Sequence, residues 1–250
     1  MLADRFQVAQ IYTDYDQMLA DVNVDSIYIA SPNSLHFSNY AKIRELLETI
    51  GDLKVVQCNY SQYSSRYDKL LEGEVTNVFD PAFSGGALAD INIYNLHFVT
   101  GLFGQAQHVT YLANKAANGI DTSGILLMKY AGFVCECIGA KDSCSPSFAV
   151  LQGTRGYIKL NSSPNECLSF EVGTGDKVET YNFQKSANRM TYEIAEFERI
   201  YHQGDHKKCR ELLEHSLCVI KTLVAAREDA GIVFAADRKS SEMGNVRVNL

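Results

Sequence analysis

The sequence predicts an α+β fold, in which a short α/β segment precedes a mostly antiparallel open sheet with flanking helices. Residues 24–30, VDSIYIA, are rich in β-branched side chains and are typical of one buried parallel strand. From residue 107 onward, short alternating runs are separated by Gly, Asn, Asp and Ser, which indicates an antiparallel meander. Two amphipathic patterns, at about residues 191–202 and 207–229, predict helices that close the fold.

Length and composition are those of a globular protein. The chain has 250 residues, of which 46% are hydrophobic and 21% charged, enough for one large or two small domains. The net charge of −7 argues against a nucleic-acid or anionic-membrane partner, and no apolar run reaches the length of a membrane span. Seven cysteines without a CxxC motif indicate reduced thiols in a cytoplasmic protein. We expect no metal site, because His and Cys do not occur in ligand pairs.

The first candidate binding residues follow the predicted strand. This strand ends at Ser31-Pro32-Asn33, and a new helix is expected to begin just before His36. Ligands of open α/β sheets lie at the carboxyl ends of strands, so Ser31, Pro32, Asn33 and His36 are candidates for ligand contact. The alternative is a plain loop in which Pro32 only ends the strand.

The middle of the chain is read as a helix over residues 40–50 and a strand over residues 53–63. Residues 64–82 are expected to form a loop, with Arg66 and Lys69 as its cations. Later in the chain, Gly-containing segments at 130–132, 153–156 and 174–176 predict hairpin corners, and Asp205 is a good N-cap for the last helix.

The stretch from Phe83 to Gly104 opens with a polar turn and then continues without a breaker for about four to five helical turns. Asp90, Tyr94 and His97 stand at i, i+4 and i+7, a spacing that places a carboxylate, a phenol and an imidazole on one helical face. One interpretation is the wall of an active site that passes a proton to or from a substrate oxygen. The other is a core helix whose polar side chains bind neighbouring backbone.

Two motifs resemble a known family: VDSIYIASPNSLHF at 24–37 and SGGALADINIYNLHFVTGLFG at 84–104. In this order they resemble the Gfo/Idh/MocA family of NAD(P)-dependent oxidoreductases. The resemblance implies a partial Rossmann-type NAD(P)-binding domain over residues 1–42 and a C-terminal oxidoreductase domain over 43–237. The polar residues 238–250 form a tail.

The resemblance also implies a reaction. A hydride would pass between the nicotinamide of NAD or NADP and a hydroxyl or carbonyl of a sugar, polyol or dihydrodiol-like substrate. Asp90 matches the family's acidic helix residue, and Tyr94 matches the position that acts as proton donor or acceptor. His97 lies one turn further on, where members vary. A homo-oligomer through the open sheet face is expected.

The motif Ser31-Pro32-Asn33 with His36 matches the family's cofactor-side loop. The sequence contains neither a GxGxxG turn nor the family's Glu-Lys-Pro motif, so we expect an internal gap and weakened dinucleotide affinity. Arg66 and Lys69 are candidates to replace the missing lysine. The alternatives are a catalytically silent binding or dimerisation module, or an incomplete gene product.

Overall fold

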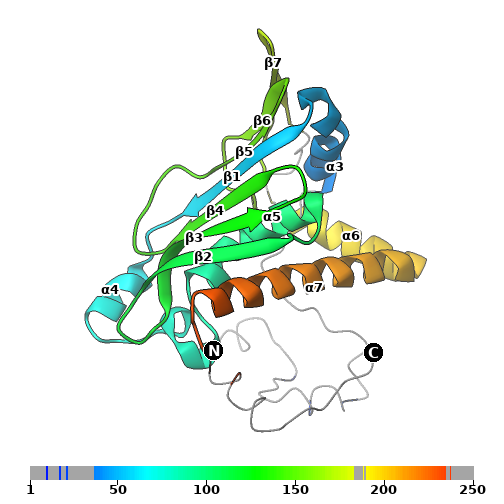
Figure 1. Cartoon of the computed structure of the whole chain (residues 1–250). Helices are drawn as coiled ribbons and strands as arrows, with labels where there is room; N and C mark the ends of the chain where they lie inside the picture. Colours follow the sequence, from blue (N-terminus) through cyan, green and yellow to red (C-terminus); the bar gives the residue numbers. More distant parts are fainter. Residues whose placement is uncertain are drawn as a thin grey trace. The chain divides into compact units, whose positions relative to one another are not determined.

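The computed structural model describes residues 37–182 and 190–234, together with single residues such as 188 and 237 (Figure 1). The chain divides into two compact units, residues 1–32 and 33–250. The elements expected before residue 37, including the strand at 24–30, lie outside the described residues.

The second unit takes in all of helix α3 (Phe37–Leu46), ahead of residue 43, where we expect the second domain to begin. One contact ahead of residue 43 lies within this unit: the buried Asn39 side-chain amide donates to the Cys167 carbonyl. The assignment of the first residues to a Rossmann-type domain stays a prediction.

An open sheet of eight strands, in the order β2-β3-β4-β1-β5-β6-β7-β8, forms the centre of the second unit. The strands are β1 (Leu53–Ser61), β2 (His108–Lys115), β3 (Asp121–Lys129), β4 (Val134–Ala140), β5 (Phe148–Gly153), β6 (Gly156–Leu160), β7 (Phe170–Thr174) and β8 (Lys177–Tyr181). In the described sheet β1 and β4 pair in parallel, and the other neighbours are antiparallel. The predicted α+β class and antiparallel sheet are confirmed.

Helices cover one face of this sheet, and α5 lies behind β1 and β4 in Figure 1. The helical elements after α3 are η1 (Leu47–Ile50), α4 (Ser65–Leu71), η2 (Asn77–Phe79), η3 (Pro81–Phe83), η4 (Leu88–Asn92), α5 (Ile93–Phe103), α6 (Met190–Gln203) and α7 (His206–Asp229). The predicted cap of α7 is confirmed, because the Asp205 carboxylate accepts from the Lys208 amide at 3.0 Å. None of the described helices is long and apolar enough to cross a membrane.

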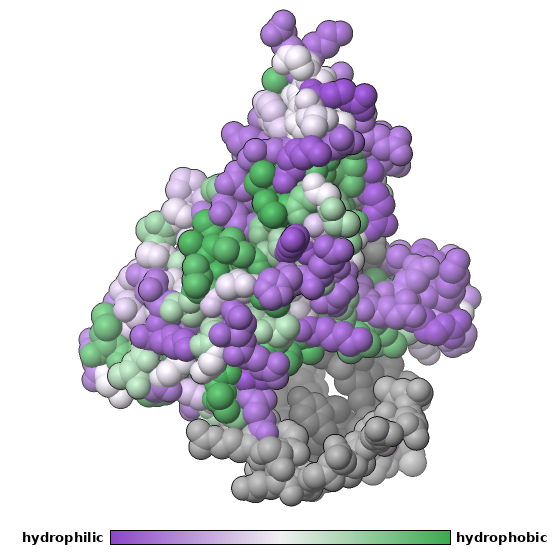
Figure 2. Space-filling view, viewed as in Figure 1, coloured by the Kyte–Doolittle hydropathy of each residue, from purple (hydrophilic) through white to green (hydrophobic). Residues whose placement is uncertain are grey.

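The alternation of β1 and β4 separates the two faces of the sheet. Val56 and Cys58 of β1 and Cys135 and Cys137 of β4 are buried on the side of α5. The other face carries exposed apolar side chains, and Figure 2 shows apolar surface gathered over the sheet. Its larger exposed members are Leu112, Ile125, Leu127 and Val134.

Two expectations differ from the structure. Part of the stretch 64–82 is helix α4 rather than loop, because the Ser64 side chain caps it by accepting from the Arg66 amide. The apolar stripe expected to face inward on α7 is also partly exposed: Leu213 is 64% and Leu217 is 52% exposed.

Candidate active site

A buried carboxylate fixes the start of the helix that carries the predicted site residues. The Leu88 amide donates to Asp121 Oδ2 at 2.6 Å, and the Tyr111 hydroxyl donates to the same oxygen at 2.8 Å. Gly86 has φ +110°, and a Cβ placed there would lie 2.0 Å from Asp121 Oδ1. Burial raises the pKa of Asp121, and these donors partly offset that rise. The Asp121 carboxylate therefore already accepts the Leu88 amide at the start of the helix, just after the polar turn.

The first turn of this helix, η4, is a π-helix that leads directly into α5. It rests on β4 through two asparagines. Asn92 Nδ2 donates to the Cys137 carbonyl at 3.0 Å, and Asn95 Nδ2 donates to the Ile138 carbonyl at 2.9 Å. A Cβ on Gly139 would lie 2.6 Å from the Asn92 Cβ. The helix thus packs directly against β4, and these two hydrogen bonds fix its rotation about its own axis.

The three residues predicted to share one face make three different contacts. Asp90 forms an ion pair with Lys141, the Tyr94 ring packs on the Tyr60 ring at a centroid distance of 5.5 Å, and His97 contacts His215 of α7. A π-helical turn closes its hydrogen bond over one more residue than an α-helical turn. A spacing rule that assumes 3.6 residues a turn therefore does not hold across η4.

Lys141 is the residue of this arrangement that the sequence reasoning missed. It follows β4 directly, and its side chain is only 10% exposed, whereas the side chain of its partner Asp90 is 40% exposed. A signal was present in the sequence. Cys135, Cys137 and Gly139 alternate toward the helix, and continuing this period of two places Lys141 on the same side.

Tyr60 and Lys141 lie at the carboxyl-terminal ends of two central strands, β1 and β4. Because β1 and β4 run parallel, these ends meet, with Tyr60 opposite Gly139 and Ser61 opposite Ala140. Tyr94 reaches these strand ends through its contact with Tyr60. The phenol, the ammonium and the carboxylate of the candidate site therefore come from elements that are packed together.

His97 forms a separate cluster with His215. Its Nδ1 lies 3.1 Å from His215 Nε2, and the rings stack with an interplanar angle of 13°. Burial, followed by the nearby His215, lowers the pKa of His97 to about 3, and burial, followed by the Arg44 guanidinium, lowers that of His215. Both imidazoles are thus neutral near pH 7, and one N–H donates to the other ring. A groove of about 840 Å³, formed by residues of α3, α5 and α7, has His215 in its lining.

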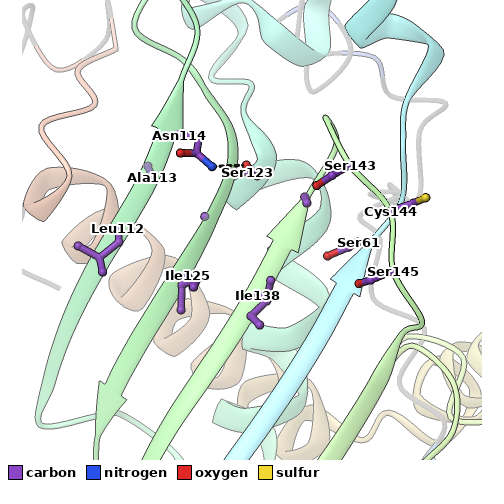
Figure 3. A pocket seen from close by; sticks show the side chains of 12 residues that line it. Ser61, Leu112, Ala113, Asn114, Ser123, Ile125, Ile138, Ser143, Cys144 and Ser145 are labelled. Atoms are coloured by element: carbon purple, nitrogen blue, oxygen red, sulfur yellow. Dashed lines mark hydrogen bonds between the residues drawn. The ribbon is translucent and has the colours of Figure 1, made fainter.

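A second cavity, of about 530 Å³, opens on the other face of the sheet (Figure 3). Leu112, Ile125 and Ile138 supply apolar surface, and hydroxyl and amide groups line the rest. Asn114 Nδ2 donates to Ser123 Oγ at 2.9 Å across this wall. Ser61, next to Tyr60, is among its lining residues. At the end of β1, therefore, one face lines this cavity, and the other face contacts Tyr94 through Tyr60.

Residues 40–159 match the model of the GFO/IDH/MocA C-terminal domain. By this match, residues 40–159 carry a C-terminal domain of the Gfo/Idh/MocA family type. The oxidoreductase YgjR of Escherichia coli K12, named as uncharacterized, is 29% identical over 94% of this chain and 86% of its own length. The scyllo-inositol 2-dehydrogenase (NADP(+)) IolU of Bacillus subtilis 168 is 26% identical over 94% and 87%. Porcine trans-1,2-dihydrobenzene-1,2-diol dehydrogenase is 21% identical over 94% and 86%.

Solved structures agree on the fold. The 3-ketoreductase KijD10 of Actinomadura kijaniata superposes with a TM-score of 0.61 at 16% identity. That match covers 78% of this chain but only 58% of KijD10, less than two thirds of its length. The aldose-aldose oxidoreductase of Caulobacter crescentus gives a TM-score of 0.58 at 16% identity, with 76% and 57% covered. The alignment with YgjR spans 289 residues, more than the 250 of this chain. Some YgjR residues within the alignment therefore have no counterpart in this chain, in agreement with the expected internal gap.

The Gfo/Idh/MocA resemblance assigns a cofactor loop to Ser31, Pro32, Asn33 and His36, and all four lie outside the described residues. Their contact with a cofactor stays a prediction.

Of the two cations expected to replace the family's lysine, Lys69 pairs with Glu74 at 2.7 Å on the surface, and Arg66 lies on the exposed first turn of α4. The cation that pairs with Asp90 is Lys141.

The cysteines fit the expectation of reduced thiols. All seven are free, and Cys58, Cys135, Cys137 and Cys167 are buried. Burial raises the pKa of the Cys58 and Cys137 thiols, which makes them poor nucleophiles. Within the described ranges, His, Cys, Asp and Glu side chains form no group of three that could hold a metal ion.

Proposed function

We propose that this protein is an NADP(H)-dependent oxidoreductase that transfers a hydride between nicotinamide and a hydroxyl or carbonyl of a sugar, polyol or dihydrodiol-like substrate. One observation carries the proposal: Tyr94 and Asp90 of one helical stretch contact Tyr60 and Lys141, which lie at the carboxyl-terminal ends of the paired strands β1 and β4. The names of the relatives support the reaction class, because they are dehydrogenases of scyllo-inositol and of trans-1,2-dihydrobenzene-1,2-diol, and the first names NADP(+).

The described residues handle the proton of such a reaction. When bound, nicotinamide supplies or accepts the hydride at carbon, and the substrate oxygen needs a partner for its proton. A tyrosine phenol, with a reference pKa of about 10, is protonated near neutral pH and is able to donate to a carbonyl oxygen during reduction. Asp90 holds Lys141 by an ion pair. A phenol and a paired ammonium on elements packed at the same strand ends form a donor set that suits a hydride-transfer cofactor.

We further propose that Ser31, Pro32, Asn33 and His36 contact the cofactor. The family resemblance supports this assignment. The glycine turn before η4 does not offer an alternative phosphate site, because the Leu88 amide already donates to Asp121.

A titration of NADPH into the purified chain, followed by nicotinamide fluorescence, tests the proposal. We expect saturable binding in the micromolar range, and absence of binding at millimolar NADPH contradicts it. Tyr94→Phe should keep this binding but lose NADP+ reduction with scyllo-inositol by about 10²-fold or more. Tyr201→Phe is the matched control, because Tyr201 is 70% exposed on α6 and should retain activity.

A second candidate function is a dimerisation module that acts through the open sheet face. The observation that favours it is the exposed apolar set Leu112, Ile125, Leu127 and Val134 on that face. Light scattering should report a dimer that Leu127→Lys converts to monomer. Ile194→Lys, on α6, is the control and should leave the dimer intact. A wild-type monomer at high micromolar concentration contradicts this candidate.

A further inference from the structure

Lys141 is deeply buried for a lysine, and its one ion pair uses only part of its ammonium group. Its side chain is 10% exposed, and lysine is almost never this buried unless it is paired. An ammonium group has three N–H donors. Within residues 37–182 and 190–234, Asp90 Oδ2 is the acceptor that Lys141 Nζ reaches. Two N–H donors of a nine-tenths buried cation are therefore without a protein acceptor in the described part of the chain.

The backbone around Lys141 is held from both sides. Its amide donates to the Thr122 carbonyl at 2.9 Å, and its carbonyl accepts from the Ser64 amide at 2.9 Å. The preceding carbonyl, of Ala140, accepts from the Gln62 amide at 2.9 Å. A side chain on a backbone fixed in this way has little freedom to move, which is the condition for a pre-organised site.

The position of Lys141 connects it to the proposed proton donor. Asp90 stands four residues before Tyr94 on the same helix, and Tyr94 packs on Tyr60. Tyr60 is in register with Gly139, two residues before Lys141. The Asp90 side chain is 40% exposed, so the ion pair is open to solvent on the carboxylate side. A ligand can approach from that side.

We propose that Lys141 is a catalytic residue, whose ammonium binds the reacting oxygen of a hydroxyl or carbonyl substrate while Asp90 fixes its direction. This inference rests on the proposed oxidoreductase function. During reduction the carbonyl carbon gains a hydride and the oxygen gains a proton from Tyr94, which recovers its proton from solvent. The Lys141 N–H groups stabilise the negative charge that develops on the oxygen before the proton arrives. Oxidation follows the same steps in reverse.

Competitive lysine acetylation, quantified by mass spectrometry, tests the contact without cofactor or turnover. In the presence of scyllo-inositol the acetylation of Lys141 should fall several-fold, whereas that of Lys54, exposed beside Asp52, should stay constant. Equal acetylation of Lys141 with and without scyllo-inositol overturns the inference. The NADPH titration is independent of this result, so failure of the proposed function and failure of the Lys141 assignment are distinguishable.

Variants separate a catalytic role from a structural one. Lys141→Met should lower kcat/KM for scyllo-inositol with NADP+ by about 10²- to 10³-fold with unchanged NADPH affinity, and Lys141→Arg should restore part of it. Lys54→Met, at an exposed position beside Asp52, should match wild type. Because Lys141→Met leaves Asp90 unpaired, the double variant with Asp90→Asn provides a neutral pair that should fold as wild type. Wild-type kcat/KM in either Lys141→Met background overturns the assignment.

Discussion

Gly86 lies so close to Asp121 that a Cβ atom on Gly86 would stand 2.0 Å from the carboxylate Oδ1. The same carboxylate accepts the Leu88 amide and the Tyr111 hydroxyl, so it cannot move aside without losing both hydrogen bonds. The start of the helix that carries Asp90 and Tyr94 is thus set by a residue far along the chain.

Gly86→Ala should destabilise the fold by about 3 kcal/mol, from the steric clash together with the positive φ. Gly119→Ala is the matched control. Gly119 also has a positive φ, +83°, but a Cβ there meets nothing within 4 Å. It should cost only about 1 kcal/mol of backbone strain. Urea unfolding measures both, and equal losses would show that the contact with Asp121 does not matter.

Asp121→Ala leaves a buried amide and a buried hydroxyl without an acceptor, so we expect a loss of about 2–4 kcal/mol in the free energy of unfolding. Asp121→Asn retains one acceptor oxygen and should lose less. Hydrogen exchange of the Leu88 amide provides the local measurement, and it should accelerate most in Asp121→Ala. Unchanged exchange in that variant would contradict the capping role.

Gly139→Ala should push the helix away from β4, because the new Cβ would lie 2.6 Å from the Asn92 Cβ and 3.1 Å from its Cα. The expected loss of stability is about 1–3 kcal/mol. Lys141 and Asp90 should separate as the helix moves, so oxidoreductase activity should fall as well. Gly132→Ala, where a Cβ meets nothing within 4 Å, is the control. Thermal unfolding and kinetics compare the two variants.

The buried His97–His215 pair predicts that stability falls in mild acid. The pKa of His97 is lowered to about 3 in the fold, below the ordinary value of 6.5. As pH falls below 6.5, His97 is therefore protonated in the unfolded chain but stays neutral in the folded chain. Stability is complete above pH 6.5 and decreases toward pH 3, by up to about 1.4 kcal/mol per pH unit for this group.

Unfolding free energies at pH 7 and pH 5 measure this dependence, and His97→Gln should flatten it. His202→Gln, at an exposed position on α6, should leave the slope unchanged. A wild-type protein whose stability does not vary between pH 7 and pH 5 would contradict the buried neutral pair.

Local patterns explain which elements were predictable. The strands follow the alternation of side chains, and the hairpin corners follow the glycines, since both depend on neighbours in the chain. Helix α4 was missed because its cap is one serine hydroxyl at Ser64, in a segment without a long apolar stripe. The sequence predicts the apolar stripe on α7, but Leu213 and Leu217 in this stripe are more than half exposed. An amphipathic pattern shows that a helix has an apolar face, but not how much of that face another element covers.

The sequence by itself determined the α+β class, the antiparallel meander, the Asp205 cap and, through two motifs, the family resemblance. It also predicted Asp90 and Tyr94 as site residues, because both stand in one of those motifs. Only the tertiary structure decided their partners. Lys141 is 51 residues from Asp90, and His215 is 118 residues from His97. The alternation along β4 indicates on which face Lys141 lies, but its contact with Asp90 depends on the π-helical turn and on the packing of the helix against β4, which leave no periodic signal in the sequence.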